Sequence, residues 1–337
     1  MALSGWIAAL ATGIRERSTD FRFSQFGLQV LPVPPLDEQQ AIAKYVRHVE
    51  REVGTAIRAK QRMMALLKEH KQAVVDFEVT GGLGIDIVNL TQSELPKGWK
   101  TEPFLRRVIE RADYRGATPE KTTSGITLVT AKNIRRGYID YDASREYVDP
   151  KKYATIMRRG LPRVGDLLFT TEAPLGNFAL ADRENVAFAQ RVMRFRFEPT
   201  AVDPRFILHA FASSCVQQQL AQRATGSTAP GIKASKLPQI LVSFPPLEEQ
   251  VEISRRIDDL TGVATRLIEK TEREISLLRE YQNRLIADVV TGKLDVRAAA
   301  VALPDVDPHG PGPAAYDADE EGLDGDLDCD DLTEESM

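Results

Sequence analysis

The chain has 337 residues, 42% of them hydrophobic, which is enough apolar material for one or two buried cores. Its two cysteines, Cys215 and Cys329, stand far apart, which excludes a disulfide framework and a cysteine-based zinc cluster. No apolar run reaches the roughly 18 residues of a membrane span, and no basic region opens a signal peptide. We therefore expect a cytoplasmic protein without a membrane partner.

The net charge of −5 averages two segments of opposite sign. Residues 96–245 carry 24 Lys and Arg against 14 Asp and Glu, a net charge of +10, and residues 297–337 carry one Arg against 13 acids, a net charge of −12. A basic segment favours an anionic partner such as nucleic acid. Because the acidic segment has few large apolar groups, we predict a disordered tail at 297–337. A tail that competes with DNA for the basic segment is a weaker hypothesis.

Residues 1–33 are too few to form a domain. Ala11-Thr12-Gly13 and the stretch 23–30 nevertheless parallel Ala224-Thr225-Gly226 and the stretch 234–240, which lie ahead of a second, similar helix. We therefore expect residues 1–33 to be the remnant of a domain whose body is absent. The alternative is a short helix and strand added to the helix that follows.

Two stretches of the chain, 34–84 and 245–295, are copies of each other. They align without a gap at a shift of 211 positions, and 15 of their 51 residue pairs are identical. Both begin with Pro-Pro-Leu, an acidic residue and Glu-Gln, and both end near Thr-Gly. Proline and acidic residues suit the first turn of a helix, and glycine commonly ends one. This pattern predicts long helices over 34–84 and 245–296.

Within both copies the apolar residues alternate at spacings of four and three, which favours an antiparallel coiled coil of the two helices. Two surface helices on a globular core are the alternative, but a narrow seam of nearly five heptads suits another helix better. The predicted seam runs through Ile42, Val46, Val49, Val53, Ala56, Lys60, Met63, Leu67, His70 and Val74, and through Ile253, Ile257, Leu260, Ala264, Leu267, Thr271, Glu274, Leu278, Tyr281 and Leu285.

The helices enclose a segment of mixed pattern. Residues 85–94 read as a linker, and 95–244 as a globular domain that opens at Leu95-Pro96-Lys97-Gly98-Trp99. We predict one helix over 204–224 and β-strands over 126–130, 167–171, 178–181, 192–197 and 240–244, with turns between them. The predicted fold class is α+β, with a mixed, mostly antiparallel sheet in the domain.

The turns of this domain supply the candidate DNA-binding residues. Arginine pairs with guanine, asparagine pairs with adenine, and cations attract phosphates. A turn between predicted strands, a strand end with a nearby Gln-Arg pair, and a Gly-Ser-Thr loop all offer such groups. The predicted DNA-binding residues are Lys132, Asn133, Arg135, Arg136, Tyr138, Thr171, Arg191, Thr228 and Lys233. Arg158, Arg159 and Arg163 are weaker candidates, because they also fit a plain basic face.

Known catalytic patterns are missing from the sequence. It contains no Walker A motif, nucleophile elbow, His-Glu-x-x-His motif or Asn-Pro-Pro-aromatic motif of amino-methyltransferases. Its four histidines are scattered, and Asp149-Pro150-Lys151-Lys152 lacks the spaced acid pair of a nuclease. We therefore expect a non-catalytic chain that binds no metal and no cofactor of its own.

Several motifs together resemble the specificity subunits of type I restriction–modification enzymes. They are Pro-Pro-Leu-x-Glu-Gln before each long helix, Thr-Gly-x-Leu after each, the Leu-Pro-x-Gly-Trp opening and Gly116-Ala117-Thr118-Pro119. Gly165-Asp166-Leu167-Leu168 and the stretch 225–232 complete the set, which covers residues 11–296. In that family two target-recognition domains each read half of a split DNA site, and two antiparallel helices separate them.

The resemblance implies that residues 1–33 derive from a first target-recognition domain, that 95–244 form a complete one, and that the chain binds double-stranded DNA. It also implies partners: DNA adenine methyltransferase subunits, which carry S-adenosylmethionine, and a motor–nuclease restriction subunit. Three alternatives stay open. The chain could be a truncated scaffold or competitor that holds methyltransferase subunits, a piece of a self-contained methyltransferase–nuclease, or one half of a homodimer.

Overall fold

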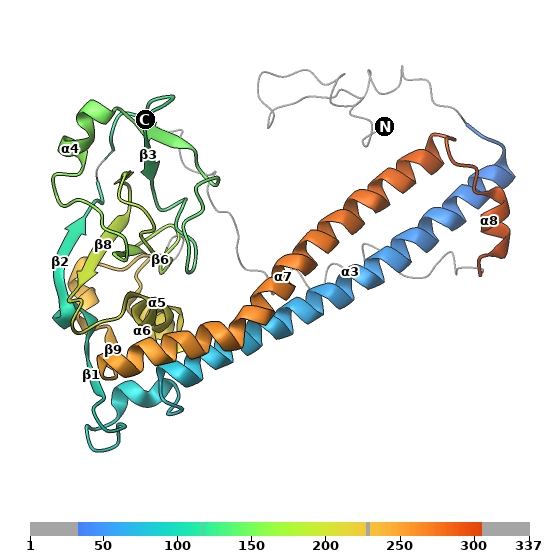
Figure 1. The fold of residues 1–337 in the computed structure, drawn as a ribbon. Coiled ribbons are helices and arrows are strands. Elements are labelled where there is room, and N and C mark those ends of the chain that lie inside the picture. Colours follow the sequence, from blue (N-terminus) through green and yellow to red (C-terminus); the bar gives the residue numbers. More distant parts are fainter. Residues whose placement is uncertain (1–32, 117, 227–229, 305–337) are drawn as a thin grey trace. The chain divides into compact units, whose positions relative to one another are not determined.

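The computed structural model describes residues 33–116, 118–226 and 230–304. The predicted remnant up to residue 32 and the predicted tail from residue 305 lie outside the described residues. The chain divides into two compact units (Figure 1). The central unit is Leu66–Leu267, and the flanking unit combines the residues before Leu66 with those after Leu267.

The α+β class with two long helices is confirmed. Helix α3 spans Leu36–Val79 and helix α7 spans Leu247–Val290, each of 44 residues. Their first and last residues are related by the same shift of 211 positions that aligns the sequence copies. The duplication therefore sets the limits of both helices.

The glutamine of each Pro-Pro-Leu-x-Glu-Gln motif forms two hydrogen bonds to the prolines at the start of its own helix. Gln39 donates from its backbone N to Pro35 O (2.9 Å) and from Nε2 to Pro34 O (2.8 Å). Gln250 repeats both bonds, to Pro246 O (3.0 Å) and Pro245 O (2.9 Å). These motif glutamines thus close the first turn of each helix.

A threonine and a glycine end each helix in the same way. Thr80 Oγ1 donates back to Asp76 O (2.6 Å), and Thr291 Oγ1 donates to Ala287 O (2.7 Å). Gly81 and Gly292 follow with φ of 59° and 73°, the left-handed conformation that glycine adopts without strain. The repeated Thr-Gly pair is therefore a helix stop.

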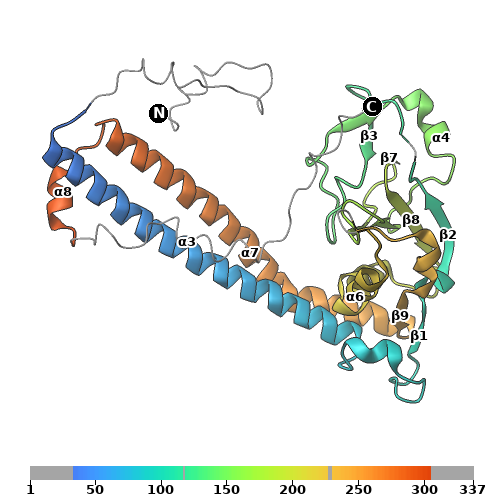
Figure 2. The same ribbon diagram turned by 180° about the vertical axis from the view of Figure 1, so that it is seen from behind.

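In the flanking unit α3 and α7 lie side by side and antiparallel (Figures 1 and 2). Lys60 Nζ lies 2.6 Å from Glu274 Oε2, and Glu38, nearer the start of α3, interacts electrostatically with Arg297, beyond the end of α7. The two helices enclose a small core of Val49, Val53, Ile57 and Ile275. This packing agrees with a coiled coil.

Some of the predicted seam residues are buried, and at other positions the neighbouring residue is buried instead. Val49, Val53, Ile253, Ile257, Ala264 and Thr271 are buried as predicted. Leu260, Leu267 and Tyr281, which the heptad register placed inside, are exposed, and Thr261, Ile268 and Ile275 are buried instead. The buried residues of α7 still alternate at spacings of four and three, but in the opposite order to the predicted one, so every second position of the seam moves by one residue.

A short helix, α8 at Arg297–Ala302, occupies the start of the segment predicted as a disordered tail. Its sequence Arg-Ala-Ala-Ala-Val-Ala has high helix propensity, and Ala300 is buried. Local alanine content outweighs the acidic average of the segment here.

The central unit contains three β-sheets. Strands β1 (Lys100–Pro103) and β9 (Leu241–Phe244) form an antiparallel pair. The main sheet is antiparallel and has the order β2-β8-β5-β6, with β2 at Val108–Asp113, β8 at Val192–Phe197, β5 at Leu167–Thr170 and β6 at Phe178–Leu180. The third has the order β4-β3-β7, with β4 at Glu146–Val148, β3 at Ile126–Val129 and β7 at Val186–Phe188; β3 and β7 are parallel.

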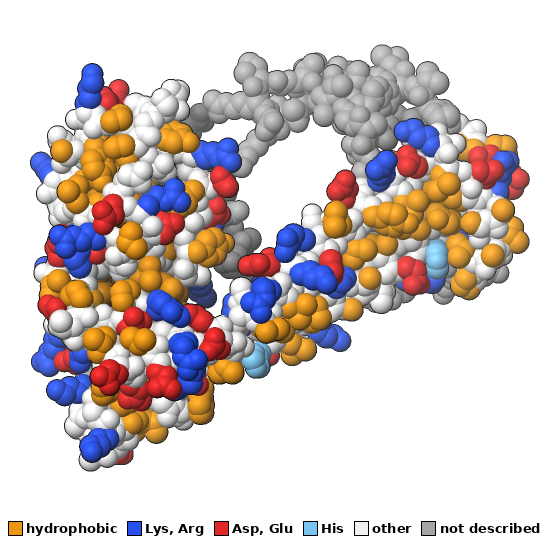
Figure 3. Space-filling model, viewed as in Figure 1, with side chains coloured by type: hydrophobic (Ala, Val, Ile, Leu, Met, Phe, Trp, Pro, Cys, Tyr) orange, Lys and Arg blue, Asp and Glu red, His pale blue; other side chains and the backbone are white. Residues whose placement is uncertain are grey.

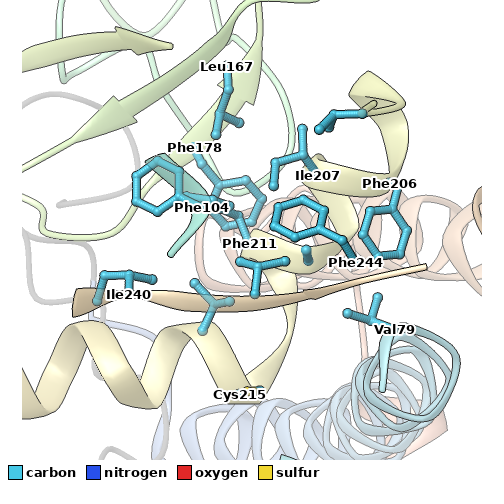
Figure 4. Packing of buried hydrophobic residues seen from close by; sticks show 14 of the residues in the cluster. Val79, Phe104, Leu167, Phe178, Phe206, Ile207, Phe211, Cys215, Ile240 and Phe244 are labelled. Carbon is cyan, nitrogen blue, oxygen red and sulfur yellow. The ribbon is translucent and has the colours of Figure 1, made fainter. Parts of the chain in front are cut away.

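The main sheet separates two hydrophobic cores. Alternate residues of a strand face opposite sides, so Leu167 and Phe169 enter one core and Leu168 the other. The first core packs Phe104 edge-on against Phe211 of helix α5 (Pro204–Ala212), with ring centroids 5.2 Å apart (Figure 4). The second core lies between the main sheet and β4-β3-β7. Both faces are covered, which explains why β5 is buried at every position.

The predicted helix 204–224 is two helices, α5 at Pro204–Ala212 and α6 at Ser214–Arg223. Ser213 breaks the run in an extended conformation, and its side chain accepts from Val216 N. The Asp76 carboxylate of α3 caps the first residue of α6: it accepts hydrogen bonds from Ser214 N and from Ser214 Oγ, both at 2.7 Å. One turn on, Gln217 Nε2 donates to Gly176 O (3.4 Å) in the loop between β5 and β6.

His209 of α5 makes the stability of the central unit sensitive to acid. Burial lowers the pKa of His209 from 6.5 to about 4; the positive charge of Arg205 adds to this shift, and Asp203 opposes it only weakly. The unfolded chain therefore binds the extra proton first, and stability falls as the pH drops from about 6.5 towards 4. We expect a loss of about 2 kcal/mol between pH 7 and pH 5, measured by urea unfolding. The His209→Gln variant should lack this component; equal losses in both proteins would contradict it.

Candidate nucleic-acid interface

The predicted binding segments meet at one edge of the central unit. Strands β2 and β5 end where β8 and β6 begin, because all neighbouring pairs of the main sheet are antiparallel. Strands β3 and β7 are parallel, so the chain leaves both in one direction, into the turns 130–140 and 190–191. We call the surface formed by residues 130–140, 171–177, 190–191 and 225–226 with 230–233 the loop edge.

Three backbone hydrogen bonds and one from a side chain join the four segments of the loop edge. Ala131 N donates to Gln190 O (3.4 Å), and Thr171 N donates to Arg191 O (3.3 Å). Ile232 N donates to Thr171 O (2.8 Å), and Asn177 Nδ2 donates to Ile134 O (2.8 Å). Segments up to about a hundred residues apart in the sequence therefore form one connected surface.

Asn133 builds the turn 130–140 and does not face outward. Its side chain is fully buried: Oδ1 accepts from Thr130 N (3.0 Å), and Nδ2 donates to Asp140 O (3.0 Å) and Ser144 O (2.9 Å). The prediction that Asn133 contacts a base is wrong, because its amide is used within the turn.

The other predicted residues of this turn are exposed. Lys132 and Arg136 make no ion pair with any residue that the structure describes. Arg135 Nε lies 3.7 Å from Asp140 Oδ2, beyond hydrogen-bonding distance. Tyr138 is 60% exposed. The turn thus presents three cations and an aromatic ring.

The remaining predicted residues divide between surface and interior. Arg191 and Lys233 are exposed. Thr171 is buried, and its Oγ1 has no hydrogen-bond partner, so the prediction that it contacts DNA directly is wrong. Thr228 lies outside the described residues. The backbone of Thr171 helps to hold the loop edge together, because its N–H donates to Arg191 O and its carbonyl accepts from Ile232 N.

Sequence reasoning missed Arg115 beside the loop edge and gave Arg159 only as a weaker candidate. Arg115 follows β2, binds the Asp113 carboxylate (Nη2 to Oδ2, 2.6 Å) and interacts electrostatically with Glu172. Arg159, a weaker candidate, donates to the backbone of Asp113 and Arg115. Arg115 was missed because β2 was not predicted, although Gly116-Ala117-Thr118-Pro119 marked the adjacent turn.

A buried ionic network joins β2, β8 and the segment before β5. Arg194 is fully buried and donates from Nη1 to Asp166 Oδ2 (2.9 Å) and from Nη2 to Glu110. Arg196 donates to the same two acids, with Nε 2.8 Å from Asp166 Oδ1. Asp166 also accepts from Arg163 N (2.8 Å). Buried charges of this kind require mutual pairing, so the network fixes these strands together.

Within residues 33–116, 118–226 and 230–304, no group of three or more His, Cys, Asp or Glu side chains is placed to hold a metal ion. The helices among these residues include none that is long and apolar enough to cross a bilayer. Burial raises the pKa of the Cys215 thiol, as expected for a packing residue.

Comparison with known proteins gives concordant matches. Residues 127–277 match the family model "Type I restriction modification DNA specificity domain". The specificity subunit of the type I restriction enzyme EcoBI from Escherichia coli is 25% identical over 87% of this chain and 64% of its own length. The MjaVIII specificity subunit from Methanocaldococcus jannaschii is 22% identical over 79% of this chain and 62% of its own length.

The chain is similar to the type I restriction enzyme specificity subunits. Its matched segment contains all four parts of the loop edge and much of α7. A solved structure concerned with complex assembly and conformational transition of the type I restriction–modification system shares the fold, with a TM-score of 0.59 at 16% identity over 87% of this chain and 68% of that one. The chain spans less than two thirds of the length of these curated relatives.

Proposed function

We propose that the chain is a non-catalytic specificity subunit that reads one half-site of a type I restriction–modification target in double-stranded DNA. The observation that carries this proposal is the loop edge, where Lys132, Arg135, Arg136, Arg191 and Lys233 are exposed on segments tied together by backbone bonds. Cations supply the attraction to phosphates, and rigid loops supply the positions from which bases are read.

The helices offer the second part of this function, the docking of methyltransferase subunits. Figure 3 shows hydrophobic side chains gathered along α3 and α7. In the flanking unit Leu277 and Tyr281 of α7, one turn apart, expose more than half of their side chains, and Met63 of α3 is exposed as well. Apolar side chains grouped in this way fit a protein partner. We propose that adenine methyltransferase subunits bind here and that a motor–nuclease subunit joins through them, in the cytoplasm.

The truncated scaffold or competitor is not favoured, because the named relatives are specificity subunits and the family match falls on the DNA specificity domain. Pairing of two copies would supply a second half-site reader. Sedimentation of the purified chain, with and without duplex DNA, measures that pairing.

The function is tested by binding the full chain to duplex DNA at several salt concentrations. We expect the logarithm of the association constant to fall with the logarithm of salt with a slope of about −3 or steeper, from three or more phosphate contacts. The methyltransferase subunit of the same system should co-purify with the chain. Phosphate contacts are strong at low salt, on the order of 50 mM. If the chain does not bind duplex DNA under that condition, the proposed reading function is wrong.

A further inference from the structure

Glu172 is an acid held firmly within the basic loop edge. The residue before it, Thr171, bonds through its backbone to Arg191 O and Ile232 N, and Glu172 itself pairs with Gly231 in an antiparallel bridge. A Cβ atom at Gly231 would lie 3.2 Å from Glu172 Cβ and 3.3 Å from Thr171 O, so any side chain there would push these neighbours away by a few tenths of an ångström. The position of Glu172 is therefore fixed from both sides.

The Glu172 carboxylate is half exposed and keeps its acceptor capacity. Its Oε1 lies 3.6 Å from Arg191 Nε, close enough for attraction but too far for a hydrogen bond. No hydrogen bond reaches this carboxylate from the residues that the structure describes. Arg191 stands at the turn 190–191, where both residues have left-handed φ values, 47° and 68°. Side-chain-bearing residues adopt this conformation at some cost, which is common where a side chain must be aimed.

A carboxylate on a surface that approaches phosphates is repelled unless it accepts a hydrogen bond from a base. In the major groove cytosine presents its N4 amino group as a donor, whereas guanine presents the O6 and N7 acceptors that arginine binds in pairs. A C·G base pair places these groups side by side. An acceptor and an arginine 3.6 Å apart therefore match the two halves of one C·G pair.

We propose that Glu172 and Arg191 together read a single C·G base pair, with Glu172 accepting from cytosine N4 and Arg191 donating to guanine O6 and N7. This inference rests on the proposed DNA-reading function and names one position of its specificity. The carboxylate also rejects guanine or thymine in place of cytosine, because those bases offer it only acceptors.

The test selects bound sequences from a random duplex library with the full-length protein, comparing wild type with Glu172→Gln, Glu172→Ala and Arg191→Ala. We expect one C·G position of the wild-type motif to lose preference by about ten-fold or more in all three variants, and the other positions to stay unchanged. Glu184→Gln, an exposed acid in the same domain, serves as the matched control and should keep the full motif.

Three results would overturn the inference: an unchanged motif, loss of preference at different positions for the two residues, or a uniform gain in affinity of the Glu172 variants for all sequences. Thermal unfolding of each variant checks that the fold is kept; Glu172→Gln preserves side-chain shape and decides the matter if the alanine variants are unstable. If the wild-type protein enriches no duplex at all, the proposed function itself fails. If the wild-type protein selects a motif and the Glu172 variants select the same one, only the Glu172–Arg191 pairing proposed here is wrong.

Discussion

Replacing Asp166 by asparagine is expected to lower the free energy of unfolding by about 3–5 kcal/mol. Asp166 is 2% exposed and balances two arginines, of which Arg194 is fully buried. Asparagine keeps the shape but removes the charge and turns one acceptor into a donor facing a guanidinium. Two buried cations would then share only Glu110.

Glu110→Gln is the matched control for this prediction. Glu110 pairs with the same two arginines, but its side chain is 40% exposed, so water replaces much of the lost interaction. We expect this variant to lose about 1 kcal/mol, as for an exposed pair. Chemical denaturation of both variants gives the comparison. Equal losses would show that burial of the network does not govern its contribution.

Removing the three cations of the turn 130–140 is expected to weaken duplex binding by about a thousand-fold or somewhat more. Each hydrogen bond from a charged donor contributes about 1.5 kcal/mol, and Lys132, Arg135 and Arg136 are all exposed. If all three contact phosphates, the triple alanine variant should also flatten the salt dependence by about 2.7 in slope. Binding titrations at several salt concentrations measure both effects.

The control for this variant removes the same charge elsewhere in the domain. Lys97, Lys100 and Arg106 are exposed and lie outside the loop edge, near β1. Their triple alanine variant should weaken binding several-fold at most, through the long-range field alone. If both triple variants weaken binding alike, the domain attracts DNA by net charge and the loop edge has no special role.

Local patterns predicted the elements that are buried or repeated. The limits of α3 and α7 follow from the duplicated Pro-Pro and Thr-Gly, and β8 at Val192–Phe197 has its predicted bounds. Strand β2 was missed because Val-Ile-Glu-Arg-Ala-Asp looks too polar for a strand. Its Glu110 is compensated by Arg194 and Arg196, which lie over eighty residues away and cannot be paired with it from the sequence.

The candidate site was predictable as a set of segments and not as a set of side chains. Turn residues on strands that end at one edge come together because of sheet topology, which the order of the strands suggests. Asn133 and Thr171, however, are used inside the turns that they help to form. Some polar side chains stabilise a turn and others remain exposed on it. The difference depends on contacts such as the hydrogen bond from Asn133 to Ser144 O, which no local sequence pattern reveals.

The carboxylate of Asp76 has a mechanical consequence. It fastens α3 to the first residue of α6, and Gln217 of α6 in turn holds Gly176, four residues from Glu172. Helix α3 is thus connected to the loop between β5 and β6 by side-chain hydrogen bonds at both ends of the first turn of α6. A displacement of the last turns of α3 would therefore reach Gly176 through the hydrogen bonds of Asp76 and Gln217.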